Sequence, residues 1–388
     1  MRILTALTYY RPHISGLTIY TERLAKALAG RGHQVTILTS QFDRSTSRLE
    51  VLDGVCIVRA PVVMRISKGV IMPTIGFLAT QLVMKNDVVH LHLPQFDAAG
   101  IALRGRLLKK PTVLTYHCDL KLPPGIFNRS ANQAVKLMNH LAALSAHRIV
   151  TYTQDYADHS PYTQRFSSKV CTILPPVDLQ AASQEEIRQF AKKHDLDNKS
   201  PVIGMAARFA AEKGVEVLLG ALPKVLRVYP NAKVLYAGQY RDVLGEEDYA
   251  RRLVPIIEKY QSNGQWEFLG VLNPDEIAAY YSNLDVLVVP SLNSTESFGL
   301  VQIEAMISGT PVIAPDLPGV RQPIAMTGMG NIFPVGDASA LSAVLLDLVG
   351  EPRKYKADSE EIRRQFSPDS TAATYEALFN DLLEDFSR

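Results

Sequence analysis

Glu296 and Glu304 lie eight residues apart in the segment 290–319, which reads PSLNSTESFGLVQIEAMISGTPVIAPDLPG. The pattern predicts a strand over 285–289, then a polar loop, then a helix from about Gly299 to Ser308. The first N–H groups of a helix lack helical partners, so they can bind a phosphate or sugar oxygen. A carboxylate inside the helix suits the vicinal hydroxyls of a ribose. The alternative is structural: Glu296 caps the helix and Glu304 is a surface residue.

Several common motifs are missing from the sequence. No GxGxxG follows the first predicted strand, no GxxxxGK[ST] occurs and no HExxH occurs, which argues against an NAD dehydrogenase, a P-loop ATPase and a zinc protease. Asp195-Leu196-Asp197 forms a DxD string that could hold a divalent metal beneath a nucleotide diphosphate. The string lies in the polar run KKHDLDNKS, so a solvated loop is the favoured interpretation.

The elements that must position these residues follow a regular alternation. Apolar, β-branched runs alternate with amphipathic stretches, as in βαβ units around a parallel sheet. In the first half the predicted strands are Arg2–Leu7, Gln34–Thr39, Asp87–Leu91, Thr112–Tyr116, His147–Tyr152 and Lys169–Leu174. In the second half they are Val202–Ala206, Lys233–Ala237, Trp266–Leu269, Asp285–Val289 and Pro311–Ala314. Helices are predicted over Thr18–Ala29 and Glu185–His194.

The chain of 388 residues is long enough for two domains. Leu174-Pro175-Pro176-Val177-Asp178 interrupts regular structure, because proline withholds an N–H and restricts its predecessor. We therefore predict an N-terminal domain over 1–178 and a C-terminal domain over 179–367, with a final helix, about 368–388, that could pack back on the first. The expected architecture is two doubly wound, Rossmann-like α/β domains facing a central cleft, with ligands at the carboxyl ends of the strands.

Composition excludes several classes of protein. Hydrophobic residues make up 47% and charged residues 21% of the chain, values typical of a soluble globular protein rather than a disordered or fibrous one. The three cysteines, Cys56, Cys118 and Cys171, are far apart and odd in number, which favours neither a disulfide framework nor a CxxC pair. The N-terminus lacks the apolar stretch of a secretion signal. We therefore expect a protein of a reducing, cytoplasmic compartment.

Charge is distributed unevenly. Residues 1–178 carry a formal charge of +11 and the remainder −9, within a net charge of +2. Such a field could concentrate an anionic ligand or surface near the first domain, although the two domains could simply attract each other. The apolar segment Val62–Met84 fits either a buried helix or an acceptor-contact or membrane-contact surface. Leu103–Lys110 (LRGRLLKK) is either a basic amphipathic patch or a solvated face.

The motif around the two glutamates resembles that of a known family. ESFGLVQIEAMISGTPVIAPDLPG resembles the E-x7-E signature of the retaining, family-four glycosyltransferases of the GT-B fold. Ala207-Arg208-Phe209 with Glu212-Lys213-Gly214 resembles the GRL…KG element of that family. YRPHISGLTIYTERLAKALAGRGHQVTILT resembles its N-terminal loop, helix and second strand, and residues 115–119 resemble its TYHxD element. The resemblance covers almost the whole chain in the right order.

The resemblance implies a set of catalytic and donor-binding residues. Arg208 and Lys213 would hold the donor diphosphate, a role that suits two cations just past a strand end. Glu304 would bind the ribose hydroxyls, His117 would contact the hexose near its anomeric centre, and Gly16 would let the first loop approach the phosphates. The hexose and leaving phosphate would be held by Glu296 and the N–H groups of Ser297, Phe298, Gly299 and Leu300. No metal site is implied.

The sequence departs from the family pattern at two motifs. Ser15 stands where the first loop usually has another glycine, and Ala207 and Phe209 replace two residues of GRL while Arg208 is retained.

Two histidines alternate on a predicted strand. His90 and His92, in VVHLHLP, are expected to face opposite sides of that strand, one packed and one towards the cleft, and so not to form a metal pair.

The family resemblance implies a metal-independent hexosyltransferase that transfers a hexose with retention of anomeric configuration, by front-face attack on a nucleotide diphosphate sugar. We expect a UDP-sugar rather than a GDP-sugar as donor and a glycan or lipid-linked sugar as acceptor, in surface polysaccharide or glycolipid synthesis. No cofactor and no nucleic acid partner are expected, and the enzyme could be peripheral on the inner face of a membrane. Two alternatives stay open: a catalytically silent sugar-nucleotide binding subunit and a GT-B nucleotide-sugar 2-epimerase.

Overall fold

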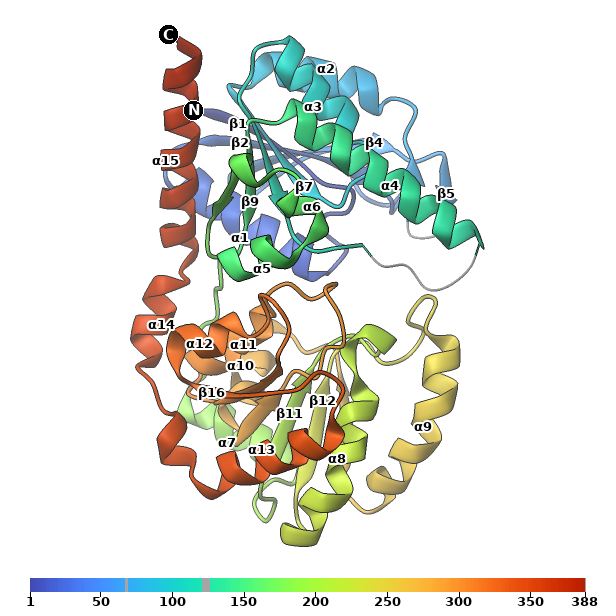
Figure 1. Ribbon diagram of the computed structural model, residues 1–388, viewed down its shortest axis with the longest axis vertical. Helices are drawn as coiled ribbons and strands as arrows, with labels where there is room; N and C mark the ends of the chain where they lie inside the picture. Colours follow the sequence, from blue (N-terminus) through green and yellow to red (C-terminus); the bar gives the residue numbers. More distant parts are fainter. Residues whose placement is uncertain (67–68, 121–125, 388) are drawn as a thin grey trace. The chain divides into compact units, whose positions relative to one another are not determined.

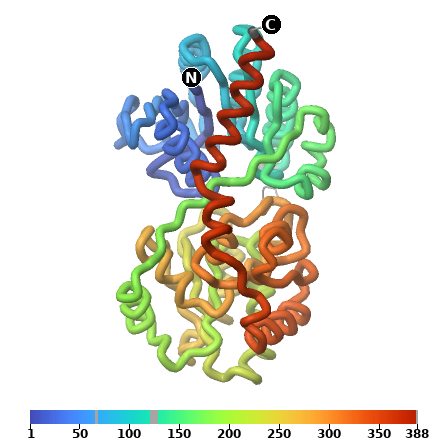
Figure 2. Tube along the Cα trace, turned by 90° about the vertical axis from the view of Figure 1, so that its left-hand side faces the viewer, coloured from blue at the N-terminus to red at the C-terminus, as the bar shows by residue number. Residues whose placement is uncertain are grey.

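The structure is a computed structural model that describes residues 1–66, 69–120 and 126–387. The chain folds into two compact units (Figure 1). The first comprises Met1–Val177 and Phe366–Arg388, and the second comprises Asp178–Gln365. The C-terminal segment therefore returns to the first unit, where helix α15 (Pro368–Ser387) runs along the N-terminal half of the chain (Figure 2).

The described part of the first unit contains an eight-stranded sheet with the order β10-β9-β8-β7-β1-β2-β4-β3. Neighbouring strands are parallel except for the antiparallel pair β3 and β4. A separate antiparallel hairpin pairs β5 with β6. The strands are β1 (Arg2–Ala6), β2 (Gln34–Gln41), β3 (Leu49–Leu52), β4 (Val55–Pro61), β5 (Met64–Ile66), β6 (Gly69–Ile71), β7 (Val88–Leu93), β8 (Thr112–Tyr116), β9 (Arg148–Thr151) and β10 (Val170–Thr172). The chain order reverses between β1 and β7, which is where a doubly wound sheet opens to a ligand.

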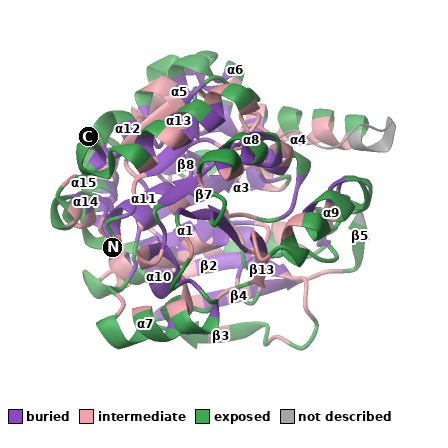
Figure 3. Cartoon of the chain, turned by 90° about the horizontal axis from the view of Figure 1, so that it is seen from below, coloured by how far each residue is buried: buried purple, intermediate pink, exposed green. Residues whose placement is uncertain are grey.

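Helices cover the sheet of the first unit, whose central strands are buried (Figure 3). The helices before the unit boundary are α1 (Gly16–Gly30), α2 (Ile75–Lys85), α3 (Ala98–Leu107), α4 (Ile126–Ser145), α5 (Gln154–His159), α6 (Pro161–Gln164) and the 3-10 turn η1 (Ser167–Lys169). Helix α15 packs on α1, where the Tyr20 and Tyr375 hydroxyls lie 2.8 Å apart and Arg31 pairs with Asp369 and Glu376. This helix is thus part of the first core.

The second unit, all of whose residues are described, contains a six-stranded parallel sheet with the order β13-β12-β11-β14-β15-β16. Its strands are β11 (Val202–Ala206), β12 (Lys233–Ala237), β13 (Trp266–Gly270), β14 (Val286–Val288), β15 (Val312–Pro315) and β16 (Gly330–Phe333). Its helices are α7 (Gln184–Lys193), η2 (Ala211–Lys213), α8 (Val215–Val228), α9 (Glu247–Ser262), α10 (Pro274–Ser282), α11 (Leu300–Ile307), α12 (Gln322–Thr327), α13 (Ala338–Gly350), η3 (Pro352–Tyr355) and α14 (Ser359–Gln365). This sheet reverses between β11 and β14.

Three predicted strands have the same bounds as observed ones: Thr112–Tyr116 is β8, Val202–Ala206 is β11 and Lys233–Ala237 is β12. The segment Val62–Met84 is not one buried helix: it forms the hairpin β5–β6 and then α2, and its residues 67 and 68 lie outside the described part. Val63 is 67% exposed and Phe77 is also 67% exposed. Much of this segment therefore faces solvent.

Candidate active site

The loops that follow β11 and β14 carry the charged residues singled out in the sequence. These strands are neighbours at the point where the sheet reverses. Arg208 and Lys213 follow β11, and Glu296 follows β14. Both strands are parallel, so both loops leave the same edge of the sheet, which is the edge where doubly wound domains bind ligands.

Lys213 and Glu296 form an ion pair between the two loops, with 2.5 Å from Nζ to Oε2. About a fifth of each side chain is exposed. The neighbouring Arg208 lies 3.1 Å from Glu212 through Nη2 and Oε1, and 45% of its side chain is exposed. Two cations and two carboxylates, all reachable from solvent, thus gather at one edge of the sheet.

Gly214 allows the two loops to touch. Its backbone has φ +67, and a Cβ built there would lie 2.1 Å from the carbonyl oxygen of Pro290. The Leu292 N–H also donates to the carbonyl of Glu212, at 2.9 Å. A side chain at position 214 would push the loops apart, which explains why glycine follows Lys213.

Helix α11 begins directly after the second loop. Its N-cap is Gly299, with φ +79 and no side-chain cap. The buried Gln302 holds the loop by donating through Nε2 to the carbonyls of Phe298, at 2.7 Å, and Val320, at 2.9 Å. Phe298 is itself buried, and Ser297 is 5% exposed. The turn 297–300 is therefore fixed by the core rather than by a capping side chain.

Glu304 lies on α11 and is half-buried. The hydroxyl of Tyr281, a fully buried residue of α10, donates to its Oε2 at 3.0 Å. This contact holds the carboxylate in one orientation. Glu304 is therefore not a freely moving surface residue, and Glu296 does not cap the helix.

The first unit places His117 in a buried cluster at the end of β8. His117 is 6% exposed, its Nε2 lies 2.9 Å from Nδ1 of His92, and its Nδ1 contacts the Tyr152 hydroxyl. Burial lowers the pKa of His117 to about 3, and the nearby His90 adds to this shift. The imidazole is consequently neutral at physiological pH.

The prediction that His90 and His92 face opposite sides of their strand is wrong. Both are fully buried, and their ring centroids lie 4.4 Å apart. Side chains two positions apart point to the same face of a strand. His90 contacts the Thr115 hydroxyl at 2.7 Å, and burial lowers its pKa to about 3. The pair is therefore part of the core.

The first loop ends at the N-terminus of α1. Ser15 caps this helix, its side chain accepting a hydrogen bond from the Thr18 N–H at 3.2 Å. A Cβ built at Gly16 would meet no atom within 4 Å. The serine that departs from the family pattern thus has a capping role, and the space beside Gly16 is open in this unit.

The structure adds partners that the sequence did not indicate. Tyr281 orients Glu304, Glu212 pairs with Arg208, and Tyr152 contacts His117. Tyr281 and Tyr152 belong to no recognisable motif, since each acts through its position in the fold. Glu212 lies in the element Glu212-Lys213-Gly214, so its location was the one signal available in the sequence.

The Asp195-Leu196-Asp197 string lies in the turn that leads into β11, with both aspartates exposed and Leu196 buried. It therefore precedes the strand, whereas Arg208 and Lys213 follow it. Within the described residues, no three His, Cys, Asp or Glu side chains gather as a metal ion requires.

Comparisons with known proteins assign the chain to a family. Residues 14–181 match the model described as Glycosyltransferase Family 4, and residues 186–365 match Glycosyl transferases group 1. An uncharacterized glycosyltransferase of Methanocaldococcus jannaschii is 27% identical over 340 residues, covering 83% of this chain and 82% of the relative. A GDP-mannose-dependent alpha-mannosyltransferase of Mycobacterium tuberculosis is 26% identical over 375 residues, covering 92% and 90%.

Solved structures agree with the fold. Anabaena HepE in complex with UDP-glucose superposes with a TM-score of 0.76 at 17% identity, over 98% of this chain and 100% of that one. The sucrose-phosphate synthase of Thermosynechococcus elongatus gives a TM-score of 0.74 at 19% identity, over 99% of both chains. The predicted membership is therefore confirmed, and the chain belongs to the family-four glycosyltransferases of the GT-B fold.

Proposed function

We propose that this glycosyltransferase moves a hexose from a nucleotide diphosphate sugar to an acceptor hydroxyl with retention of configuration. The observation that carries the proposal is the Lys213–Glu296 pair, at 2.5 Å across the reversal of the second sheet. A diphosphate needs cations and a sugar needs hydrogen-bond acceptors. Both kinds of group lie here on adjacent loops.

The two cations have distinct surroundings that suit a leaving diphosphate. Lys213 is held against Glu296, and Arg208 against Glu212. A bound diphosphate would attract both cations and leave Glu296 to accept hydrogen bonds from sugar hydroxyls. Positioned charges of this kind stabilise the negative charge that develops as the glycosidic bond breaks. In this proposal Arg208 and Lys213 take the electrostatic role for which other enzymes use a metal ion, so transfer is expected to persist in EDTA.

The remaining site residues divide between the two units. Glu304, oriented by Tyr281, would bind the ribose hydroxyls, and the N–H groups of 297–300 would hold the hexose and the leaving phosphate. His117 would contact the hexose, and Gly16 would leave space for the phosphates. Because its pKa is low, His117 would act as a neutral hydrogen-bonding group rather than as a cation.

The donor is proposed to be a UDP-sugar. Proteins similar to this chain include a GDP-mannose-dependent alpha-mannosyltransferase and a protein solved in complex with UDP-glucose, so the similarities do not decide between the two nucleotides. A thermal-shift comparison of UDP-, GDP- and ADP-sugars decides it, because a ligand at 100 times its Kd stabilises the folded state by about 2.7 kcal/mol. A shift with GDP-sugars alone would replace the UDP assignment.

A glycan or lipid-linked sugar is the proposed acceptor, in surface polysaccharide or glycolipid synthesis. Helices α2, α3 and α4 lie side by side in the first unit (Figure 1). They expose an apolar ridge made of Phe77, Met84, Leu103, Leu107, Leu137, Leu141 and Leu144. The exposed cations Lys85, Arg106, Lys109 and Lys136 lie on or next to these helices. Apolar side chains with flanking cations suit the surface of an anionic bilayer. Among the described helices, none is both long and apolar enough to cross a membrane.

Product analysis tests the function against its two rivals. Donor is incubated with and without a panel of glycan and lipid-linked acceptors, and the products and their anomeric configuration are read by NMR. Retained configuration in an acceptor-dependent product supports the proposal. A changed donor without acceptor would indicate a 2-epimerase. Donor binding without any product, across acceptors that a related active transferase uses, would indicate a silent binding subunit.

A further inference from the structure

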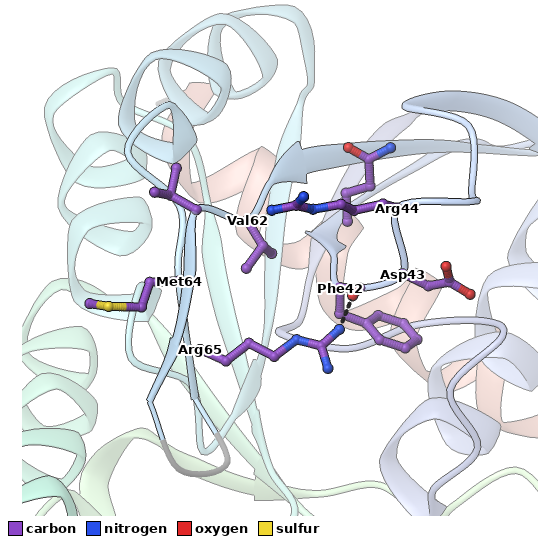
Figure 4. A pocket seen from close by; sticks show the side chains of 8 residues that line it. Phe42, Asp43, Arg44, Val62, Met64 and Arg65 are labelled. Atoms are coloured by element: carbon purple, nitrogen blue, oxygen red, sulfur yellow. Dashed lines mark hydrogen bonds between the residues drawn. The ribbon is translucent and has the colours of Figure 1, made fainter.

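A hollow of about 560 Å³ lies in the first unit, between the loop that follows β2 and the hairpin β5–β6 (Figure 4). Its lining comprises Gln41, Phe42, Asp43, Arg44, Val62, Val63, Met64 and Arg65. The volume falls within the range of about 300 to 1,000 Å³ that small-molecule sites occupy. None of these residues belongs to the donor site described above.

The hollow lies at the ligand-binding edge of the sheet. Gln41 ends β2 and Pro61 ends β4, and these two residues are partners in a parallel pair. Phe42 and Val62 therefore leave the sheet side by side at its carboxyl edge. This is the edge at which the sheets of α/β proteins bind their ligands.

The lining carries two cations. Arg44 extends from the loop towards the hairpin, and Arg65 extends from the hairpin towards the loop (Figure 4). The Arg65 guanidinium donates to the carbonyl of Phe42, and Arg44 is exposed with no ion pair to any described residue. Two guanidinium groups that form no ion pair with a carboxylate of the described residues are suited to bind the oxygens of an anion.

The acidic residue of the lining, Asp43, is engaged locally. Its Oδ1 accepts hydrogen bonds from the Ser45 N–H, at 2.9 Å, and the Ser45 hydroxyl, at 2.7 Å. Asp43 forms no ion pair with a described arginine, but the nearby charge of Arg65 adds to the hydrogen bonds from Ser45 in lowering its pKa, so Asp43 offsets part of the positive charge of the hollow. The remaining net charge of the lining is positive.

An aromatic group adjoins the cations. The Phe42 ring meets Tyr9 edge-on, with centroids 5.5 Å apart, and meets His13 at 5.7 Å. Tyr9 and His13 come from the loop after β1, so three rings from two loops gather at this edge. Rings of this kind offer flat apolar faces, and Val62 and Met64 add apolar surface on the hairpin.

We propose that this hollow binds the acceptor through an anionic phosphate group, with Arg44 and Arg65 contacting its oxygens and Phe42 contacting the adjoining apolar part. The inference rests on the proposed function, since it names the acceptor class of that same enzyme. The phosphate could belong to a lipid headgroup or to a soluble phosphorylated sugar. Both present the same oxygens to the two arginines.

Binding of simple probes, measured by calorimetry without any donor, tests the proposal. The probes are inorganic phosphate, hexyl phosphate and the neutral hexyl glucoside. Replacing both cations, in Arg44→Ala/Arg65→Gln, is expected to raise the Kd of hexyl phosphate about tenfold, as loss of charge-assisted hydrogen bonds at a partly exposed site implies. Arg44→Ala alone should raise it about threefold. This single variant removes no contact that the described structure shows, so its fold should be intact.

Two matched variants locate the binding. Arg48 is exposed on the same loop but does not line the hollow, so Arg48→Ala makes the same change in charge and should leave the Kd unchanged. Lys213→Ala removes a donor-site cation, so it should weaken any phosphate binding at the donor site and keep the binding that depends on Arg44 and Arg65. Any of three results would overturn the proposal: complete loss of binding in Lys213→Ala, an unchanged Kd in the double variant, or an equal rise of the Kd for hexyl glucoside.

A comparison of inorganic phosphate with hexyl phosphate distinguishes the two sources of the phosphate group. Equal binding of inorganic and hexyl phosphate supports a soluble phosphorylated acceptor. Tighter binding of hexyl phosphate, with arginine-dependent binding to vesicles of phosphatidylcholine and phosphatidic acid, supports a lipid phosphate. Because the calorimetric assay contains no donor, a chain that shows no transfer activity can still bind the phosphate probes through Arg44 and Arg65. Failure of the proposed function and failure of the acceptor site are therefore distinguishable.

Discussion

The ammonium of Lys213 and the carboxylate of Glu296 lie 2.5 Å apart, although 83 residues separate them in the chain. The pair joins the two loops at the reversal of the second sheet. A donor that binds Lys213 through its diphosphate must compete with Glu296 for the ammonium. In the proposed site the carboxylate would thereby become available to the sugar only when the diphosphate is in place.

This arrangement predicts coupling between the two residues. Lys213→Ala should both weaken donor binding and lower kcat, because in the proposed site Lys213 holds the leaving diphosphate. Glu296→Gln should mainly lower kcat, because it would contact the reacting sugar. Each lost charged hydrogen bond should cost roughly 1.5 to 3 kcal/mol. A double-mutant cycle on kcat/KM should be non-additive, since the residues share an ion pair. Strictly additive losses would show that the ion pair does not couple the two residues during the reaction. Normal kinetics in both single variants would remove the residues from the site.

The sequence predicted the fold class and the strands that precede the two charged loops of the second unit well, for physical reasons. Strands such as Val202–Ala206 are continuous apolar runs between turn residues, so their ends are visible in the sequence. The hairpin β5–β6 was missed because a short apolar run fits a helix or a strand equally. Contacts such as Tyr281 with Glu304 depend on how α10 packs beside α11, and no local pattern encodes that packing.

Tyr281 is expected to contribute to donor binding through Glu304. Tyr281→Phe keeps the buried ring and removes the hydroxyl that donates to Oε2. The KM for donor should rise about threefold to tenfold with kcat little changed, because the ribose contact is remote from the reacting bond. Glu304→Ala should raise the KM for donor further. The KM is measured from initial rates over a range of donor concentrations. An unaltered KM in Tyr281→Phe would show that the hydrogen bond from Tyr281 to Glu304 does not contribute to donor binding.

Gly214 is expected to tolerate no side chain. Gly214→Ala places a Cβ 2.1 Å from the Pro290 carbonyl oxygen at φ +67, so both the left-handed backbone and the loop contact are strained. Gly328 is the matched control, because it has the same φ of +67 and no atom within 4 Å of a built Cβ. Gly328→Ala should cost about 1 to 2 kcal/mol, the left-handed penalty alone. Gly214→Ala should cost more and also lower kcat/KM. Equal unfolding midpoints for the two variants would contradict the close contact.

The buried histidines predict an acid-sensitive first unit. Burial lowers the folded-state pKa of His90 to about 3, below its ordinary value near 6.5. Between these values the unfolded chain binds a proton that the folded chain does not, so stability is lost as pH falls from about 6.5 towards 3. The slope is about 1.4 kcal/mol per pH unit for each such histidine. His90→Gln should therefore be less stable at pH 7 but lose less on acidification, as read by urea unfolding at several pH values. A parallel pH profile for variant and wild type would show that His90 is protonated in the folded state.

The apolar ridge on α2, α3 and α4 predicts binding to anionic membranes. The cations to test are Arg106 and Lys109, which are exposed. Arg106 makes one long, exposed hydrogen bond, to the Leu144 carbonyl at 3.4 Å. Arg104 makes shorter ones, to the Thr80 hydroxyl at 2.8 Å and the Gly100 carbonyl at 2.7 Å, so its replacement would disturb the helices more.

The membrane test is co-sedimentation with phosphatidylglycerol vesicles. Each cation near an anionic surface contributes about 1 kcal/mol, so Arg106→Glu/Lys109→Glu should reduce the bound fraction strongly, and added salt should do the same to the wild type. Arg188→Glu is the control, because it reverses the charge of an arginine with 75% of its side chain exposed on the second unit. Phe77→Ser/Leu107→Ser tests the apolar contribution separately. Equal recovery of the wild type in the supernatant with neutral and anionic vesicles would remove the membrane surface from the proposal and leave a soluble acceptor.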